Sequence, residues 1–195
     1  NVLFESLHRI LFDGTGKLGT GSLNRDGTGT LLITENFTDR RAGNDYGVKW
    51  SGSGGFAAAS SSYLAGLSVV LGEYLPGKGQ VLTWGQDGFF ETNPDEVLDL
   101  DSASEDKVLT FGSEFSTGFV NFVNDVVVPG TNSASVAVFN TGTAGNASTA
   151  ILSGDWTGNE LKVGDAAGSE FTGDLYMTGT NSLERLMVLG GKLST

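Results

Sequence analysis

The residues whose types and spacing could do chemistry are mostly carboxylates, and the densest group lies in the run DLDSASED at 99–106. Its acidic members are Asp99, Asp101, Glu105 and Asp106. Alternate residues of a strand share a face, so Asp99 and Asp101 would lie side by side, and bound Ca²⁺ would relieve their repulsion. The run lacks the glycine turn and closing glutamate of an EF-hand loop. The alternative is a solvated acidic edge that discourages lateral aggregation.

Carboxylates elsewhere could also serve carbohydrate chemistry, which needs a pair of acids, or acids together with a cation and a basic residue. Asp87 and Asp125 join Asp99 and Asp101 as the acids that could supply it. His8 is the only histidine, so a multi-histidine metal site is excluded and a Ser-His-Asp triad would depend on a residue near the first positions. Acids at turns are also expected in any acidic chain of short strands. We therefore expect no enzymatic activity and no catalytic or cofactor-binding residues.

Trp50, Trp84 and Trp156 are the aromatic residues that could stack on sugar rings. Each lies in a run typical of a strand, where the alternative is an indole buried in the core. GTGKLG at 14–19 matches the glycine pattern of a dinucleotide-binding turn. The residues after it, TGSLNRDGTGT, cannot form the helix that such a site requires. This segment is therefore interpreted as a β-turn.

Composition and charge narrow the classes of protein further. The 195 residues carry a formal net charge of −12 and include no cysteine, which excludes disulfides, thiolate metal sites and reactive-thiol chemistry. With 11 Lys and Arg against 23 Asp and Glu, binding to a nucleic-acid backbone is not expected. No apolar run approaches the roughly 20 residues that span a bilayer, so we expect no membrane-spanning segment here.

Short strands are the elements that must position these residues. From Gly27 onward, a short apolar or alternating run is followed by Gly, Asn or Asp and then by a polar turn. Examples are TLLIT (30–34), LSVVLG (67–72), VLTFG (108–112), SVAVF (135–139) and ELKVG (160–164). Because similar phrases recur, and not merely similar spacings, the pattern favours an all-β solenoid of stacked coils. The alternative is a Greek-key β-sandwich.

The recurring phrases predict one β-solenoid over 1–195, with 1–26 as a cap or first coil and 27–195 as stacked coils. Alternate apolar residues, such as Val69 with Leu71, are expected to face the core while their neighbours face solvent. A coil of about 25 residues would give roughly eight coils. Near the N-terminus the apolar residues fit a helix and a strand equally well; they are Leu3, Phe4, Leu7, Ile10 and Leu11.

Taken in order, the phrases resemble the autotransporter-associated β-strand repeat family of long bacterial secreted proteins and autotransporter passengers. The residues that carry the resemblance include WSGSGGFAAA (50–59), VLTWGQDGFF (81–90), VNFVNDVVV (120–128) and SVAVFNTGTAGNASTAILSGDWTG (135–158). The resemblance implies a right-handed parallel β-helix and a secreted or bacterial cell-surface location. It implies no catalytic residues.

The expected function is therefore a structural extracellular scaffold, a stalk or a self-associating fibre module. Such a module would form homo-oligomers or fibres through the ends of the solenoid, where backbone groups are unpaired. One alternative is an adhesin or glycan-binding module that grips a glycan or a cell surface. A second alternative is a carbohydrate-active β-helix enzyme.

Overall fold

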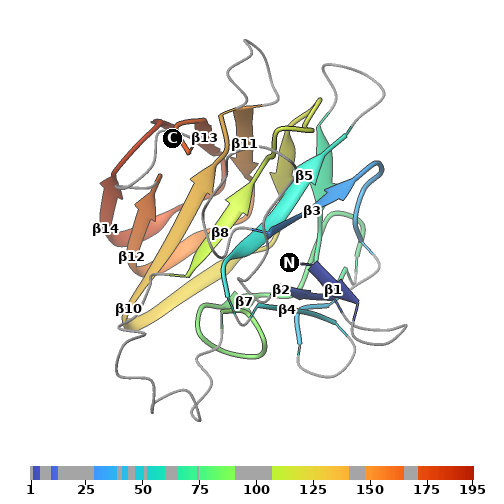
Figure 1. The fold of residues 1–195 in the computed structure, drawn as a ribbon. Coiled ribbons are helices and arrows are strands. Elements are labelled where there is room, and N and C mark those ends of the chain that lie inside the picture. The colour runs from blue at the N-terminus through green and yellow to red at the C-terminus, as the bar shows by residue number, and fades with distance from the viewer. Residues whose placement is uncertain are drawn as a thin grey trace, which may run out of the picture.

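The computed structural model describes residues 2–4, 10–12, 29–38, 41–43, 47–50, 52–59, 66–73, 75–90, 107–140, 148–164 and 171–195. The named elements within these ranges are all β-strands. The strands stack as a right-handed parallel β-helix of about four turns (Figure 1). The fold class expected from the recurring phrases is thereby confirmed.

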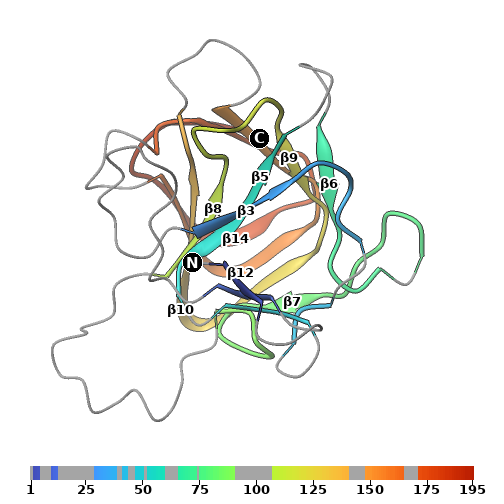
Figure 2. The same cartoon turned by 45° about the vertical axis from the view of Figure 1, so that its right-hand side comes forward.

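Two parallel sheets form the body of the solenoid and lie on two sides of the core (Figures 1 and 2). The long sheet contains, from one edge to the other, β14 (Ser182–Val188), β12 (Trp156–Val163), β10 (Val126–Val138), β8 (Val108–Phe111), β5 (Gly54–Ala58) and β3 (Gly29–Ile33). β7 (Leu82–Thr83) pairs with the start of β10. The opposite sheet contains β15 (Lys192–Ser194), β13 (Asp174–Met177), β11 (Thr149–Leu152), β9 (Val120–Phe122) and β6 (Leu67–Val69).

A third, smaller sheet comes from the N-terminal part of the chain. It contains β1 (Val2–Phe4), β2 (Ile10–Phe12) and β4 (Val48–Trp50). β1 pairs antiparallel with β2, and β2 pairs in parallel with β4. Where the sequence fitted helix and strand equally, residues 2–4 and 10–12 are therefore strands.

The direction of strand pairing decides between the two architectures considered from the sequence. Apart from β1 with β2, the named strands of the described chain pair in parallel. A Greek-key sandwich is built from antiparallel neighbours, so that alternative is wrong for this chain.

The expectation of roughly eight coils is also wrong, because coils differ in length. From β8 to β14 and from β9 to β13, residues paired between neighbouring coils are 25 to 30 positions apart, as in Leu161 with Leu186 and Ala150 with Val120. Between β13 and β15 they are 18 apart. Between β5 and β8, and between β6 and β9, the same step is much longer. Phe56 pairs with Phe111, 55 positions later. Long connections between strands therefore use residues that would otherwise form further coils.

One hydrophobic cluster fills the solenoid, and it includes the residues whose period-two spacing predicted an inward position. Val69, Leu71, Val136 and Val138 are all buried in it. Their neighbours do not all face solvent, because Val70 and Ala137 are buried as well. Ala137 belongs to a second, smaller cluster with Phe139 and Phe171. Period-two spacing therefore found the core but missed this additional burial.

Candidate functional site

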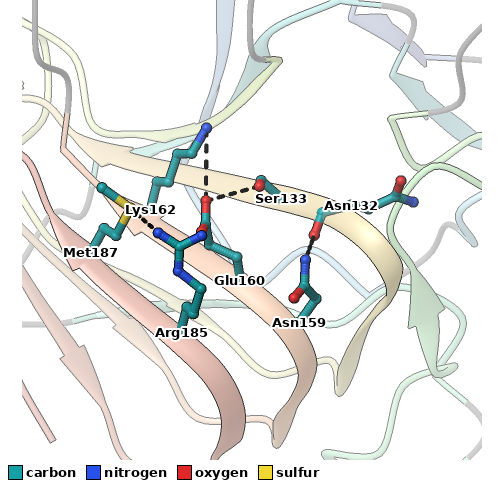
Figure 3. Close-up of polar contacts among 7 residues, drawn as sticks. All are labelled: Asn132, Ser133, Asn159, Glu160, Lys162, Arg185 and Met187. Carbon is teal, nitrogen blue, oxygen red and sulfur yellow. Dashed lines mark hydrogen bonds and ion pairs between the residues drawn. The ribbon is translucent and has the colours of Figure 1, made fainter.

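A group of interacting polar side chains crosses three strands of the long sheet. Ser133 on β10, Glu160 on β12 and Arg185 on β14 are partners in register, so they form one row across three coils. The Ser133 hydroxyl donates to Glu160 Oε1 at 2.9 Å, and an Arg185 guanidinium nitrogen lies 3.0 Å from Glu160 Oε2 (Figure 3). The Glu160 side chain is 6% exposed, whereas that of Arg185 is 65% exposed.

Further contacts connect this row to its surroundings, as Figure 3 shows. Lys162 Nζ lies 3.9 Å from Glu160 Oε1, and Arg185 approaches the Met187 sulfur at 3.8 Å. Asn159 donates to the Asn132 carbonyl of the neighbouring coil at 2.8 Å. The Glu160 oxygens thus face a hydroxyl and two cations. This arrangement neutralises a buried carboxylate and joins coils, and it does not leave the carboxylate free for proton transfer.

A second polar ladder follows the corner that each coil turns after the opposite sheet. Asp125 Oδ1 accepts the Asp155 backbone N–H at 2.8 Å, and Asp155 Oδ1 accepts the Thr180 backbone N–H at 2.6 Å. Each aspartate thus binds the backbone of the following coil. Glycine is required beside this ladder, because a Cβ on Gly154 would lie 2.1 Å from the Asn124 carbonyl oxygen. Gly154 and Asp155, in the run LSGDW, therefore both allow neighbouring coils to stack closely.

Asn124, at the same corner, is fully buried and closes the coil before it. Its Oδ1 accepts the Leu71 N–H at 2.7 Å, and its Nδ2 donates to the carbonyls of Leu71 and Gln80, both at 2.8 Å. The chain between Leu71 and Gln80 leaves the coil in a turn that includes the Leu75–Lys78 bridge. The Asn124 amide binds backbone groups on both sides of this excursion, and so stabilises the interrupted coil.

The three tryptophans are core residues. Trp50 and Trp156 are fully buried and Trp84 is nearly so. Trp84 stacks on Phe90 with ring centroids 4.2 Å apart and an interplanar angle of 9°, and Phe89 packs edge-on against Trp84. This packing agrees with the core alternative, and it leaves these indoles no exposed ring face on which a sugar could stack.

The acids singled out for chemistry are not assembled into one site by the described residues. Asp87 is exposed in the turn after β7, with a φ of 49°, and Asp125 is engaged in the corner ladder. The Ca²⁺ ligands proposed from DLDSASED lie outside the described residues, as do His8 and GTGKLG; the ligands are Asp99, Asp101, Glu105 and Asp106. Among the residues that are described, no three His, Cys, Asp or Glu side chains form a group that could hold a metal ion.

Two features were not found by inspection of the sequence. Glu160 was missed because its burial depends on which coils stack on it, and the alternation in ELKV signals only that it faces away from the core.

Phe115 is exposed on a turn that two buried serines hold. The Ser113 N–H donates to Ser116 Oγ at 2.8 Å, and the Phe115 N–H donates to Ser113 Oγ at 3.2 Å.

Comparisons with protein-family models, with curated proteins and with solved structures each find no match to this chain. Within the described ranges, no helix is long and apolar enough to cross a membrane.

Proposed function

We propose that this chain is a non-enzymatic structural scaffold of a bacterial secreted or cell-surface protein. The observation that carries the proposal is that several polar side chains, among them buried Asn124 and Glu160, join neighbouring coils. Asn124, the Asp125–Asp155 ladder and the Ser133–Glu160–Arg185 row each bind the backbone or side chains of a neighbouring coil. Such contacts resist separation of the coils, which is what a spacer under tension needs.

The proposed location is supported by sequence. The ordered resemblance to the autotransporter-associated β-strand repeat family favours export. An acidic surface with a formal net charge of −12 favours a chain that stays dispersed in solution. The corner ladders and the continuous core provide rigidity without cysteine, and the chain contains none.

Single-molecule stretching of the whole chain, held at its two ends, tests the scaffold role. We expect discrete unfolding events as coils separate, because each coil is held mainly by its neighbours. Asn124→Ala should lower the unfolding force, while Asn159→Ala, which removes an exposed hydrogen bond, should leave it nearly unchanged. Extension without resistance, like that of an unfolded chain, would refute the scaffold role.

The Phe115 turn specifically favours a second function, recognition of a glycan or cell surface. The turn presents an exposed aromatic ring on a backbone fixed by Ser113 and Ser116, and an aromatic face can stack on a sugar ring. A screen of immobilised glycans with the purified chain should show binding that Phe115→Ala abolishes. Leu75→Ala, which truncates an exposed residue in another turn, is the control. Binding that survives Phe115→Ala would contradict this role.

A further inference from the structure

Two threonines on the outer face of the long sheet have buried hydroxyls that need a partner. Thr30 on β3 is 6% exposed and Thr110 on β8 is 1% exposed. Both side chains point away from the solenoid core, because their neighbours Leu31 and Leu109 pack into it. Among the described residues, neither Oγ1 atom has a hydrogen-bond partner. Buried hydroxyls are nearly always hydrogen-bonded, to protein or to ordered water, so this pair requires an explanation.

The two threonines lie in one row across three neighbouring strands. Thr30 pairs with Gly55 on β5, and Gly55 pairs with Thr110. Figure 1 shows the three strands side by side. Ser53 Oγ accepts the Val108 N–H at 2.9 Å, which holds β5 and β8 in this register. The two hydroxyls therefore flank the same position of the middle strand, one from each side.

Gly55 leaves the position between the hydroxyls without a side chain. A Cβ on this residue would overlap the Thr110 carbonyl oxygen, so the position requires glycine. Gly55 is also buried, so the whole row is shielded from bulk solvent. Neighbouring strands lie about 4.8 Å apart, which places Thr30 and Thr110 roughly 10 Å from Cα to Cα. A direct hydrogen bond cannot span this gap, whereas two waters in series, joined by hydrogen bonds of about 2.8 Å, can.

We propose that the outer face of the long sheet binds two ordered waters over Gly55, which connect the Thr30 hydroxyl to the Thr110 hydroxyl. Each hydroxyl both donates and accepts hydrogen bonds, so a chain of waters satisfies both. An apolar occupant would leave them unpaired, and the row has no charged residue that would select an ion. The waters thus join β3 to β8 across a strand that has no side chain at this position.

Replacement of each threonine by valine tests the water chain through the sign of the effect. Thr30→Val and Thr110→Val remove one hydroxyl each and keep the shape of the side chain. With the waters bound, each change removes a hydrogen bond, so the urea midpoint of the whole chain should fall. With unpaired hydroxyls, valine would remove an unsatisfied buried group and the midpoint would rise. A raised midpoint for either variant would overturn the proposal.

The double variant distinguishes one shared water chain from two separate sites. We expect Thr30→Val to have little further effect in the Thr110→Val background, because the chain is lost with either anchor. Additive falls would contradict a bridge between the two hydroxyls. Thr157→Val, at a half-buried position of β12, is the control and should leave the midpoint nearly unchanged. An equal fall in this control would show that the effect is not specific to the row.

A crystal structure of the whole chain, at a resolution that shows ordered water, locates the ligand directly. We expect two waters over Gly55, within hydrogen-bond distance of each other and of the two Oγ1 atoms, and their loss in Thr110→Val. A dry row, or hydroxyls bonded to protein groups instead, would overturn the proposal. Neither result bears on the scaffold role, which the stretching experiment measures separately.

Discussion

At the scale of single residues, Asn124 has the largest stabilising role that the polar contacts indicate. Replacing it with Ala leaves the Leu71 N–H and the Gln80 carbonyl without their partner, whereas the Leu71 carbonyl still accepts the Gln80 N–H. At about 1–3 kcal/mol for each group left unsatisfied, we expect Asn124→Ala to lower the free energy of unfolding by about 2 kcal/mol or more. Urea unfolding followed by circular dichroism measures this loss.

The matched control is Asn159→Ala, which removes one hydrogen bond at an exposed position. We expect a loss of about 1 kcal/mol or less, because water can replace the bond. If the two alanine variants lost the same stability, the Asn124 amide would not be holding the interrupted coil.

Removing Arg185 and removing the charge of Glu160 are expected to lower the free energy of unfolding by different amounts. Arg185→Ala leaves a buried carboxylate with a more distant Lys162 as its cation, so we expect a loss of about 1–3 kcal/mol. Glu160→Gln removes the charge and leaves Arg185 largely in water, so its effect should be smaller. In the Glu160→Gln background, Arg185→Ala should then have little further effect, and a double-mutant cycle measures this coupling. Additive losses would show that the pair does not interact.

At the scale of elements, the bend inside β12 depends on Gly158. This residue has a φ of 113°, and a Cβ would lie 2.1 Å from the Val128 carbonyl oxygen. Gly130 has a φ of 60° with open space around its Cβ position. Gly130→Ala should therefore lose only about 1–2 kcal/mol for its left-handed backbone.

Gly158→Ala adds displacement of β10 to the backbone strain, and we expect a loss above about 3 kcal/mol. Thermal and urea unfolding of the two variants, side by side, measures the difference. Equal losses would mean that β10 and β12 do not approach as closely at this bend as the stacking requires.

The strands themselves could largely be predicted from the sequence. TLLIT matches β3, VLTFG matches β8, and LSVVLG contains β6. Their alternation reports a strand and its buried face, since both are local properties. The corner ladder could not be predicted, because Asp125 and Asp155 meet only after the coil length between them is fixed. For the same reason the row at Glu160 could not be predicted, although Glu160 itself lies in the strand-like run ELKVG.

At the scale of the whole molecule, the solenoid was predictable and its number of coils was not. Recurring phrases indicate stacking, but they do not say how many residues a connection removes from the stack. The 55 positions between Phe56 and its partner Phe111 show the effect. The three tryptophans are buried, as the core alternative predicted, because strands within a solenoid place alternate side chains in its core.

Amide hydrogen exchange on the whole chain tests most directly whether the described coils form one rigid stack. Amides of β8, β10, β11 and β12 should exchange slowly and together, through global unfolding, because each strand is paired on both sides. Those of β14 and β15 should exchange faster, since these strands end their sheets. Independent, rapid exchange of the inner strands would contradict a rigid stack and the scaffold role built on it.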